Sequence, residues 1–90
     1  EAMWALPLHR AYRKDLDSKV ADLKNVGTSD GGAITAALFL AEFAGETPWA
    51  HLDIAGPAFC DSADDDHPAG GTGFAVRTLI ELMTKFTRPV

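Results

Sequence analysis

Two groups of side chains in this sequence have the types and the spacing that site chemistry needs. His51 and Asp53 lie two residues apart, and a run of carboxylates with one imidazole follows at residues 61–67. Imidazole and carboxylate groups can ligate metals and can donate or accept protons. Each group is therefore a candidate site and has to be weighed against an ordinary structural role.

His51 and Asp53 share one face of a predicted strand, because side chains two apart on a strand point the same way. As metal ligands they need a further donor, and the other histidines, His9 and His67, are distant in the sequence. We therefore favour a hydrogen-bonded His–Asp pair that orients a neighbouring loop. Ala-Gly-Pro follows the pair, which indicates a strand end that opens into a site.

The acidic run does not fit a calcium loop. A loop that starts at Asp61 places Asp66 at the sixth position, where glycine is needed, and Thr72 at the twelfth, where glutamate is needed. A solvated surface loop is the favoured interpretation. Cys60, beside it, lacks a Cys-x-x-Cys partner and is interpreted as an incidental loop thiol.

The glycine-rich run at residues 70–73 precedes a predicted helix and offers backbone N–H groups that an anion could bind. It matches neither a Walker loop nor a dinucleotide-binding motif. We favour a flexible entry into the helix.

Three helices are expected to position these groups. The first follows Pro7, with apolar residues from Leu8 to Leu23 on one side. The second covers residues 33–44, is apolar nearly all round, is capped by Ser29 or Asp30 and stops at Gly45. The third carries apolar residues from position 74 to 86 behind a Thr72 cap, and a frayed tail at 87–90 is expected after it.

One strand is expected at Trp49–Gly56, ended by Pro57, with a second strand if residues 3–8 are extended. A strand needs partners for its backbone N–H and C=O groups, and a helix apolar on every side needs cover on every side. Three helices cannot enclose both faces of a lone strand together with the apolar helix. We therefore expect this segment to dock onto more protein.

The composition excludes several classes of protein. With 8 Lys and Arg against 13 Asp and Glu, the net charge is −5, which argues against a nucleic-acid binder. No apolar run approaches the roughly 18–20 residues of a membrane span. A single cysteine excludes an internal disulfide and fits a reducing compartment. The chain starts at Glu1 without a visible signal peptide, so we expect a piece of something larger.

Several stretches resemble the carboxy-terminal part of the leucyl aminopeptidase (cytosol aminopeptidase) family, and Trp-Ala-His-Leu-Asp-Ile-Ala-Gly is the most specific of them. The resemblance implies that residues 1–90 are the carboxy-terminal part of a catalytic domain. It implies an α/β fold, a fragment of a mixed-sheet, three-layer α/β/α domain with about three helices and one or two strands. The matching stretches are Glu1–Leu8, Val20–Gly27, Gly32–Phe43, Thr47–Gly56 and Gly71–Leu82.

The family has two divalent metal ions, manganese or zinc, held by a Lys, several Asp and a Glu, with a catalytic Arg that holds bicarbonate. That machinery lies on motifs such as Asn-Thr-Asp-Ala-Glu-Gly-Arg, which this sequence lacks. None of its four lysines stands in the metal-lysine context. The resemblance therefore implies no catalytic and no metal-binding residue here, no metal bound by this segment, and no activity of the isolated 90 residues.

What the resemblance transfers is part of the substrate pocket. Ala55 and Ala58 match positions that line the slot for the first side chain of the substrate. Val26 matches a residue beside the second side chain. In this view His51 and Asp53 support the strand end and do not bind metal.

The implied parent protein is a cytoplasmic, metal-dependent aminopeptidase, a hydrolase that acts in proteolysis. Its expected partners are the remainder of its own chain, peptide substrates and further copies of itself, since relatives are hexamers. No nucleic acid and no membrane partner is expected. The alternative is a non-enzymatic interaction module of the same fold fragment that associates with itself.

Overall fold

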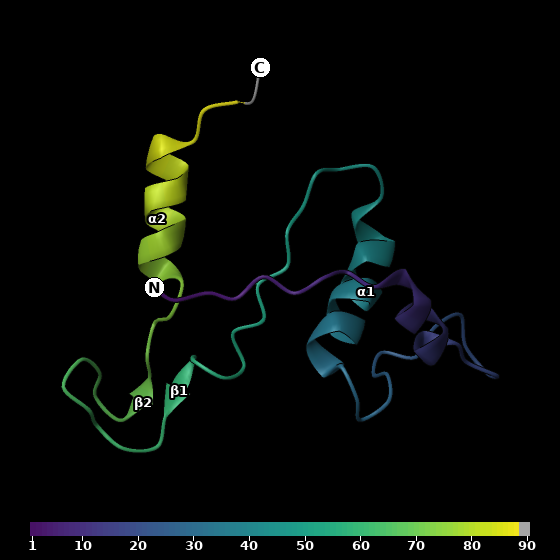
Figure 1. The fold of residues 1–90 in the computed structure, drawn as a ribbon, viewed down its shortest axis with the longest axis horizontal. Coiled ribbons are helices and arrows are strands. Elements are labelled where there is room, and N and C mark those ends of the chain that lie inside the picture. The colour runs from purple at the N-terminus through teal and green to yellow at the C-terminus, as the bar shows by residue number, and fades with distance from the viewer. Residues whose placement is uncertain (89–90) are drawn as a thin grey trace. The chain divides into compact units, whose positions relative to one another are not determined.

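The computed structural model describes residues 1–88 and divides the chain into two compact units. One unit is Trp4–Asp53, and the other joins residues 1–3 to the chain from Ile54 onwards. The elements are a 3-10 helix, η1 (Arg10–Leu16), the α-helices α1 (Gly32–Ala44) and α2 (Val76–Lys85), and the strands β1 (Phe59–Cys60) and β2 (Gly70–Gly71) (Figure 1). Three helices and a two-stranded sheet make this an α/β fragment, as predicted.

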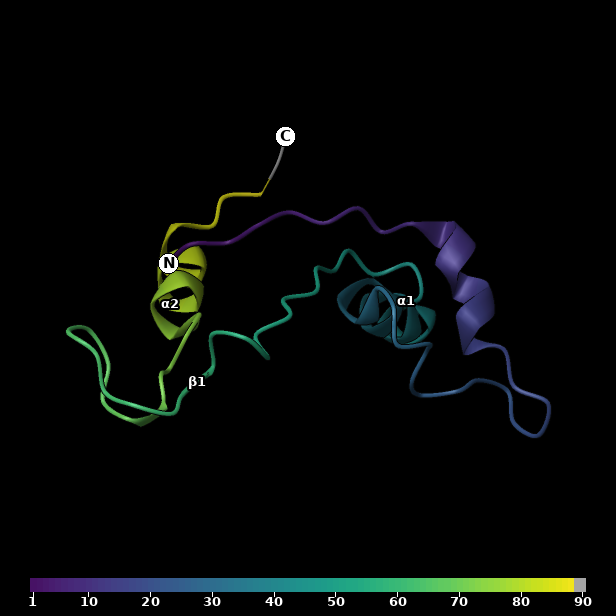
Figure 2. The ribbon, with the colours of Figure 1, turned by 60° about the horizontal axis from the view of Figure 1, so that its bottom comes forward.

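In the unit Trp4–Asp53, η1 packs against α1 (Figure 2). Leu16 of η1 and Leu38 of α1 are buried, and Thr35 of α1 is buried beside them. On the surface, Nε of Arg13 donates to Glu42 at 2.5 Å, which joins the two helices a second time. These contacts form a small core of one helix against another.

The first helix is shorter than predicted. It ends at Leu16, because the hydroxyl of Ser18 accepts hydrogen bonds from the N–H groups of Val20 and Ala21 at 3.2 and 3.1 Å. A serine that binds its own neighbouring backbone in this way competes with helix formation. Val20, predicted to lie on the buried face, is 97% exposed.

The prediction of the second helix is confirmed within one residue, including its end at Gly45. Its predicted caps are wrong: the N-cap is Gly31, in a left-handed conformation with φ of 64°, and no side chain caps the helix. The carbonyl of Gly31 accepts from the N–H groups of Ile34 and Thr35, both at 3.0 Å.

The predicted strand at Trp49–Gly56 is wrong for this structure, because residues 49–54 have no regular structure and a turn follows at 55–58. An interior strand forms only where a neighbouring strand pairs with its backbone, and the two strands of the described residues, β1 and β2, pair with each other. Residues 3–8 are likewise not a strand. The strands lie instead in the segment predicted to be a loop, where β1 and β2 pair antiparallel with Phe59 opposite Gly71.

The last helix follows this hairpin. The N–H of Thr72 donates to the carbonyl of Ala58 at 2.9 Å, and its hydroxyl donates to the carbonyl of Pro57 at 2.6 Å. Thr72 thus closes the hairpin and is not the predicted cap of α2, which begins after Ala75. Of the predicted frayed tail, residues 87 and 88 have no regular structure, and residues 89–90 lie outside the described part.

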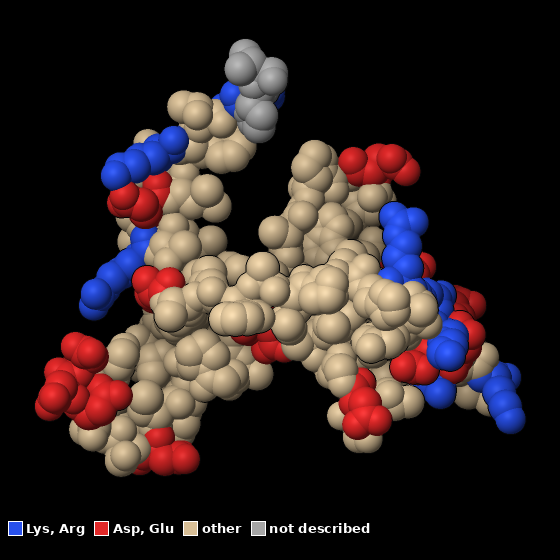
Figure 3. All heavy atoms as spheres, viewed as in Figure 1, with Lys and Arg blue, Asp and Glu red and all other residues tan. Residues whose placement is uncertain are grey.

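The chain buries few apolar side chains. Among residues 1–88 the buried ones are Leu16, Leu38 and Ala75, and no residue of α2 is buried. Much of the face drawn in Figure 3 is uncharged atoms, while Asp and Glu gather over the hairpin at the lower left. None of the described helices has the length and apolar character needed to cross a bilayer.

Candidate functional site

Val26 lies on the wall of an open hollow of about 640 Å³ within the unit Trp4–Asp53. The segment of residues 21–26 forms one side, and Phe39 and Phe43 of α1 form the other. Val26 and Phe43 are 69% and 71% exposed. The lining is mixed: the apolar residues are Ala21, Leu23, Val26, Phe39 and Phe43, and the polar ones are Asp22, Lys24 and Asn25. An apolar group of a ligand could pack against the apolar part.

The chain holds Val26 there by turning back on itself. The N–H of Lys24 donates to the carbonyl of Leu16 at 2.8 Å, so the segment is tied to the buried end of η1. Gly27 lies against Thr35, because a Cβ added at Gly27 would stand 3.0 Å from the Cβ and Oγ1 of that threonine. Val26 therefore sits between two anchored residues.

Ala55 and Ala58 belong to the other unit and form the turn at residues 55–58. The N–H of Ala58 donates to the carbonyl of Ile54 at 2.9 Å, and its own carbonyl accepts from Thr72. Ala55 is exposed and Ala58 is half-buried. The structure places these two alanines together, while their grouping with Val26 stays a prediction.

The ring nitrogen Nδ1 of His51 is buried and has no hydrogen-bond partner among the described residues. The ring lies beside Trp49, with ring centres 6.5 Å apart. A buried polar atom that lacks a partner is costly. The predicted pairing of His51 with Asp53 stays a prediction.

At the start of α2, just after the glycine-rich run, a carboxylate of the same chain fills the position that an anion could take. The carboxylate of Glu1 accepts from the N–H groups of Ala75 at 2.8 Å and Thr78 at 3.1 Å, at the start of α2. The side-chain hydroxyl of Thr78 also donates to it. These hydrogen bonds lower the pKa of Glu1. The backbone N–H groups that an external anion could use are thus bound by a residue of the same chain.

The acidic loop contains a cluster that the sequence interpretation missed. Cys60, Asp64 and His67 each place one potential ligand atom within 4.8 Å of the others. The carboxylate of Asp64 accepts hydrogen bonds from the N–H groups of Asp66 and His67. These bonds lower the pKa of Asp64, and the bond from Asp66 contributes most. The spacing Cys-x₃-Asp-x₂-His is present in the sequence, but the three side chains come together only through the turn that the structure shows.

Comparisons with known proteins identify the class of protein to which these features belong. The family model described as "Cytosol aminopeptidase family, catalytic domain" matches residues 1–80. The chain belongs to this family, as its resemblance predicted. The matched residues contain none of the motifs that carry the family's metal ligands.

Individual relatives agree. A "Probable cytosol aminopeptidase" of Picosynechococcus sp. is 56% identical over 80 residues, which are 89% of this chain and 16% of that protein. One of Synechococcus sp. (strain CC9311) is 56% identical over 89 residues, covering 98% and 18%. The chain therefore spans 16–18% of the length of these two relatives.

Two solved structures are also similar. The bottromycin maturation enzyme BotP, solved in complex with Mn, is 55% identical with a TM-score of 0.75, covering 84% of this chain and 17% of its own. A mutant of tomato leucine aminopeptidase is 40% identical with a TM-score of 0.76, covering 92% and 16%.

Proposed function

We propose that this chain is the carboxy-terminal part of the catalytic domain of a metal-dependent aminopeptidase that removes N-terminal amino acids from peptides. The segment supplies walls of the substrate pocket and packing surface, and the rest of the protein supplies catalysis. The observation that carries the pocket role is the hollow beside Val26. Family membership supports the reaction class.

The hollow suits a side chain of a peptide substrate. Val26, Phe39 and Phe43 present apolar surface, and Val26 stays exposed although its neighbours in the chain are anchored. Fixed apolar walls favour binding because little conformational freedom is lost when the ligand enters. Val26 therefore contacts the second side chain of the substrate in this proposal.

Ala55 and Ala58 line the slot for the first side chain. Their methyl groups occupy little space, and the hydrogen bonds of Ala58 to Ile54 and Thr72 fix the backbone beneath them. A wall made of short side chains on a fixed turn leaves room for a bulky first residue. The size of the residue at position 58 thus sets the depth of the slot.

The two metal ions, manganese or zinc, are held by the rest of the enzyme. Among the His, Cys, Asp and Glu side chains of the described residues, one group of three lies together, and it contains a cysteine and a histidine. This donor set does not fit a two-metal centre of Lys, Asp and Glu. We therefore assign no catalytic residue to this segment.

The remainder of the protein covers the exposed apolar surfaces. Phe43 of α1 is 71% exposed, and along α2 the exposed fractions reach 54% at Ile80 and 73% at Met83. Burial of such side chains contributes about 1.5–3 kcal/mol each. We propose a cytoplasmic enzyme that forms homo-oligomers, with a mixed sheet in which residues 51–55 form one interior strand.

The second candidate is a self-associating module without enzymatic activity. The same exposed faces of α1 and α2 favour it, because copies of the chain could cover one another. It requires no residues outside the segment. The two candidates therefore differ in what the intact protein does.

The test compares the intact protein with the segment. We expect the intact protein with manganese or zinc to hydrolyse leucine-p-nitroanilide, and residues 1–90 alone to hydrolyse none under the same conditions. Turnover by the segment alone would contradict the proposed division of roles. An inactive intact protein together with stable self-association of the segment would support the interaction module.

A further inference from the structure

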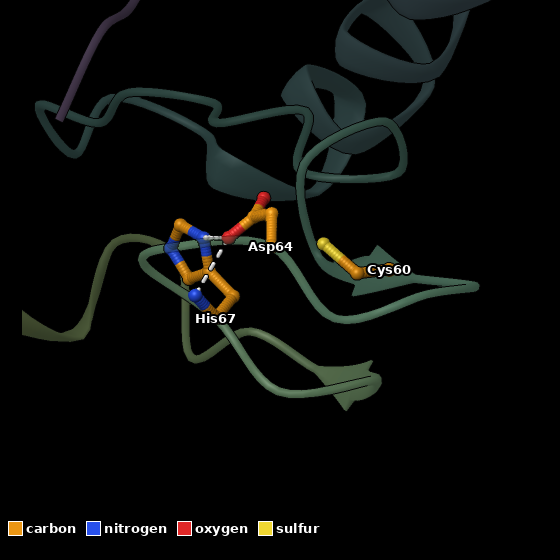
Figure 4. A group of neighbouring side chains, drawn as sticks. All are labelled: Cys60, Asp64 and His67. Carbon is orange, nitrogen blue, oxygen red and sulfur yellow. Dashed lines mark hydrogen bonds and ion pairs between the residues drawn. The ribbon is translucent and has the colours of Figure 1, made fainter.

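Cys60, Asp64 and His67 converge on one side of the hairpin, although three residues lie between the first two in the chain and two between the last two. The thiol of Cys60 comes from β1, and the other two side chains come from the turn beyond it (Figure 4). The sulfur, one carboxylate oxygen and one ring nitrogen all lie within 4.8 Å of one another. Thiolate, carboxylate and imidazole are the three ligand types that zinc takes in proteins.

The turn holds Asp64 and His67 in place. The N–H of Asp64 donates to the carbonyl of His67 at 2.9 Å. Oδ1 of Asp64 accepts from the N–H groups of Asp66 at 2.9 Å and His67 at 2.7 Å, and lies 3.3 Å from Nδ1 of His67. The contacts from Asp66 and His67 to the carboxylate all go to Oδ1, which leaves Oδ2 for a ligand.

The base of the hairpin holds Cys60. Its pairing with Gly70 sets the register of β1 and β2, and the two hydrogen bonds of Thr72, to Ala58 and Pro57, close the chain below. Cys60 is half-buried, whereas Asp64 and His67 are exposed. The thiol is therefore fixed from one side and open toward the turn.

We propose that Cys60, Asp64 and His67 bind one zinc ion, with water completing the coordination. Zinc–sulfur bonds of about 2.3 Å and zinc–nitrogen or zinc–oxygen bonds of about 2.0–2.2 Å imply ligand separations of about 3.3–3.8 Å in a tetrahedral site. Rotation of the exposed side chains closes the difference from 4.8 Å. Calcium and magnesium prefer oxygen ligands throughout, so thiolate and imidazole select against them.

The bound ion links Cys60 of β1 to Asp64 and His67 of the turn and so cross-links the hairpin. This differs from the expectation that the segment binds no metal, which followed from the family's motifs and not from this loop. The inference goes beyond the proposed function, and it needs no catalytic role for the ion.

Cobalt is the probe, because cobalt bound to a thiolate absorbs strongly in the near ultraviolet. We expect the intact protein, titrated with Co²⁺, to show a thiolate charge-transfer band that Cys60→Ser abolishes. Asp64→Asn and His67→Ala should each weaken cobalt binding by at least about tenfold. Zinc added to the cobalt form should remove the band, because zinc binds such sites more tightly.

Asp65→Asn is the matched control, since it removes a carboxylate from the same loop but not from the cluster, and it should leave the titration unchanged. The absence of a band in the intact protein would overturn the proposal. So would a band that is lost in Cys60→Ser but unaffected by both Asp64→Asn and His67→Ala, because it would report a thiol acting alone. Turnover of leucine-p-nitroanilide by the intact Cys60→Ser protein tests the proposed function independently of the zinc site, because this variant lacks the thiol ligand.

Discussion

The carboxylate of Glu1 accepts a hydrogen bond from the backbone N–H of Ala75 at 2.8 Å, across 74 positions of sequence. Because it also binds Thr78, the first residue of the sequence caps the last helix. Ala75, the N-cap residue of α2, has no side-chain acceptor and adopts a left-handed conformation with φ of 73°. A negative charge at this end is favourable, because the helix dipole is positive there.

Removal of this cap should loosen the start of α2. We expect Glu1→Ala to accelerate hydrogen exchange of the Ala75 and Thr78 amides in the intact protein, and Glu1→Gln, which retains one carbonyl oxygen, to have a smaller effect. Hydrogen exchange followed by mass spectrometry or NMR measures both. Glu46→Gln, an exposed carboxylate in the other unit, is the control and should leave these amides unchanged.

The cap should also depend on pH. The hydrogen bond from the Thr78 side chain, with those from the Ala75 and Thr78 amides, lowers the pKa of Glu1 below its ordinary 4.5. Because the folded-state pKa is the lower one, the stabilisation is complete above pH 4.5 and is lost as the pH falls through the folded-state value.

The Thr78 amide shift in an NMR pH titration measures this transition. Its midpoint should lie below 4.5, and Glu1→Gln should remove it. A midpoint at or above the ordinary value would contradict the assigned cap.

Leu16 should matter most to the unit Trp4–Asp53. It is 1% exposed at the contact between η1 and α1, so Leu16→Ala leaves a cavity and should lower the free energy of unfolding by about 2–5 kcal/mol. Val20→Ala removes an apolar side chain that is 97% exposed and should have little effect. Unfolding of the intact protein by urea compares the two, and equal shifts would contradict this core.

Gly27 should not tolerate a side chain. A Cβ at this position stands 3.0 Å from Thr35, which is 2% exposed and cannot move outward. Gly27→Ala should therefore destabilise the protein by about 1–3 kcal/mol and displace the wall of the hollow that carries Val26.

Gly32→Ala is the matched control for this substitution. Nothing lies within 4 Å of a Cβ there, and alanine favours the first turn of α1. Thermal unfolding should shift downward for Gly27→Ala and not for Gly32→Ala. The same downward shift for both would show that the contact with Thr35 is not the cause.

The slot proposal predicts a change in specificity at Ala58. In the intact enzyme, Ala58→Met should narrow the slot and lower kcat/KM for substrates with a bulky first residue relative to alanine, by about 1–3 kcal/mol. The ratio of kcat/KM for phenylalanine and alanine substrates measures this. An unchanged ratio would remove Ala58 from the pocket wall.

The sequence predicts elements well where local chemistry decides them. The run of apolar and small residues that ends at Gly45 predicts α1 within one residue. It fails where distant groups decide. The strand at 49–56 needs a neighbouring strand, and Glu1 takes the cap position expected for Thr72. The sequence interpretation also misses one local effect, because the hydroxyl of Ser18 binds the N–H groups of Val20 and Ala21 and the first helix ends at Leu16.

The candidate sites also differ in whether the sequence alone could predict them. Val26, Ala55 and Ala58 come from matching stretches of sequence, and the hollow beside Val26 is consistent with that role. The Cys60 cluster could not be predicted from spacing alone. It depends on the register of β1 with β2 and on a turn in which Asp64 binds its own neighbouring backbone.

The hydrogen bonds of Thr72 to Pro57 and Ala58 have a consequence for evolution and engineering. They hold residue 72 next to residues 57 and 58, so residues 59–71 form a loop whose two ends lie side by side. A change in the length of such a loop costs little closure entropy and need not move the elements on either side. The stretch between His67 and β2 is therefore the natural place to insert a label or a binding tag, because Ala58, α2 and the spacing of Cys60, Asp64 and His67 are all kept.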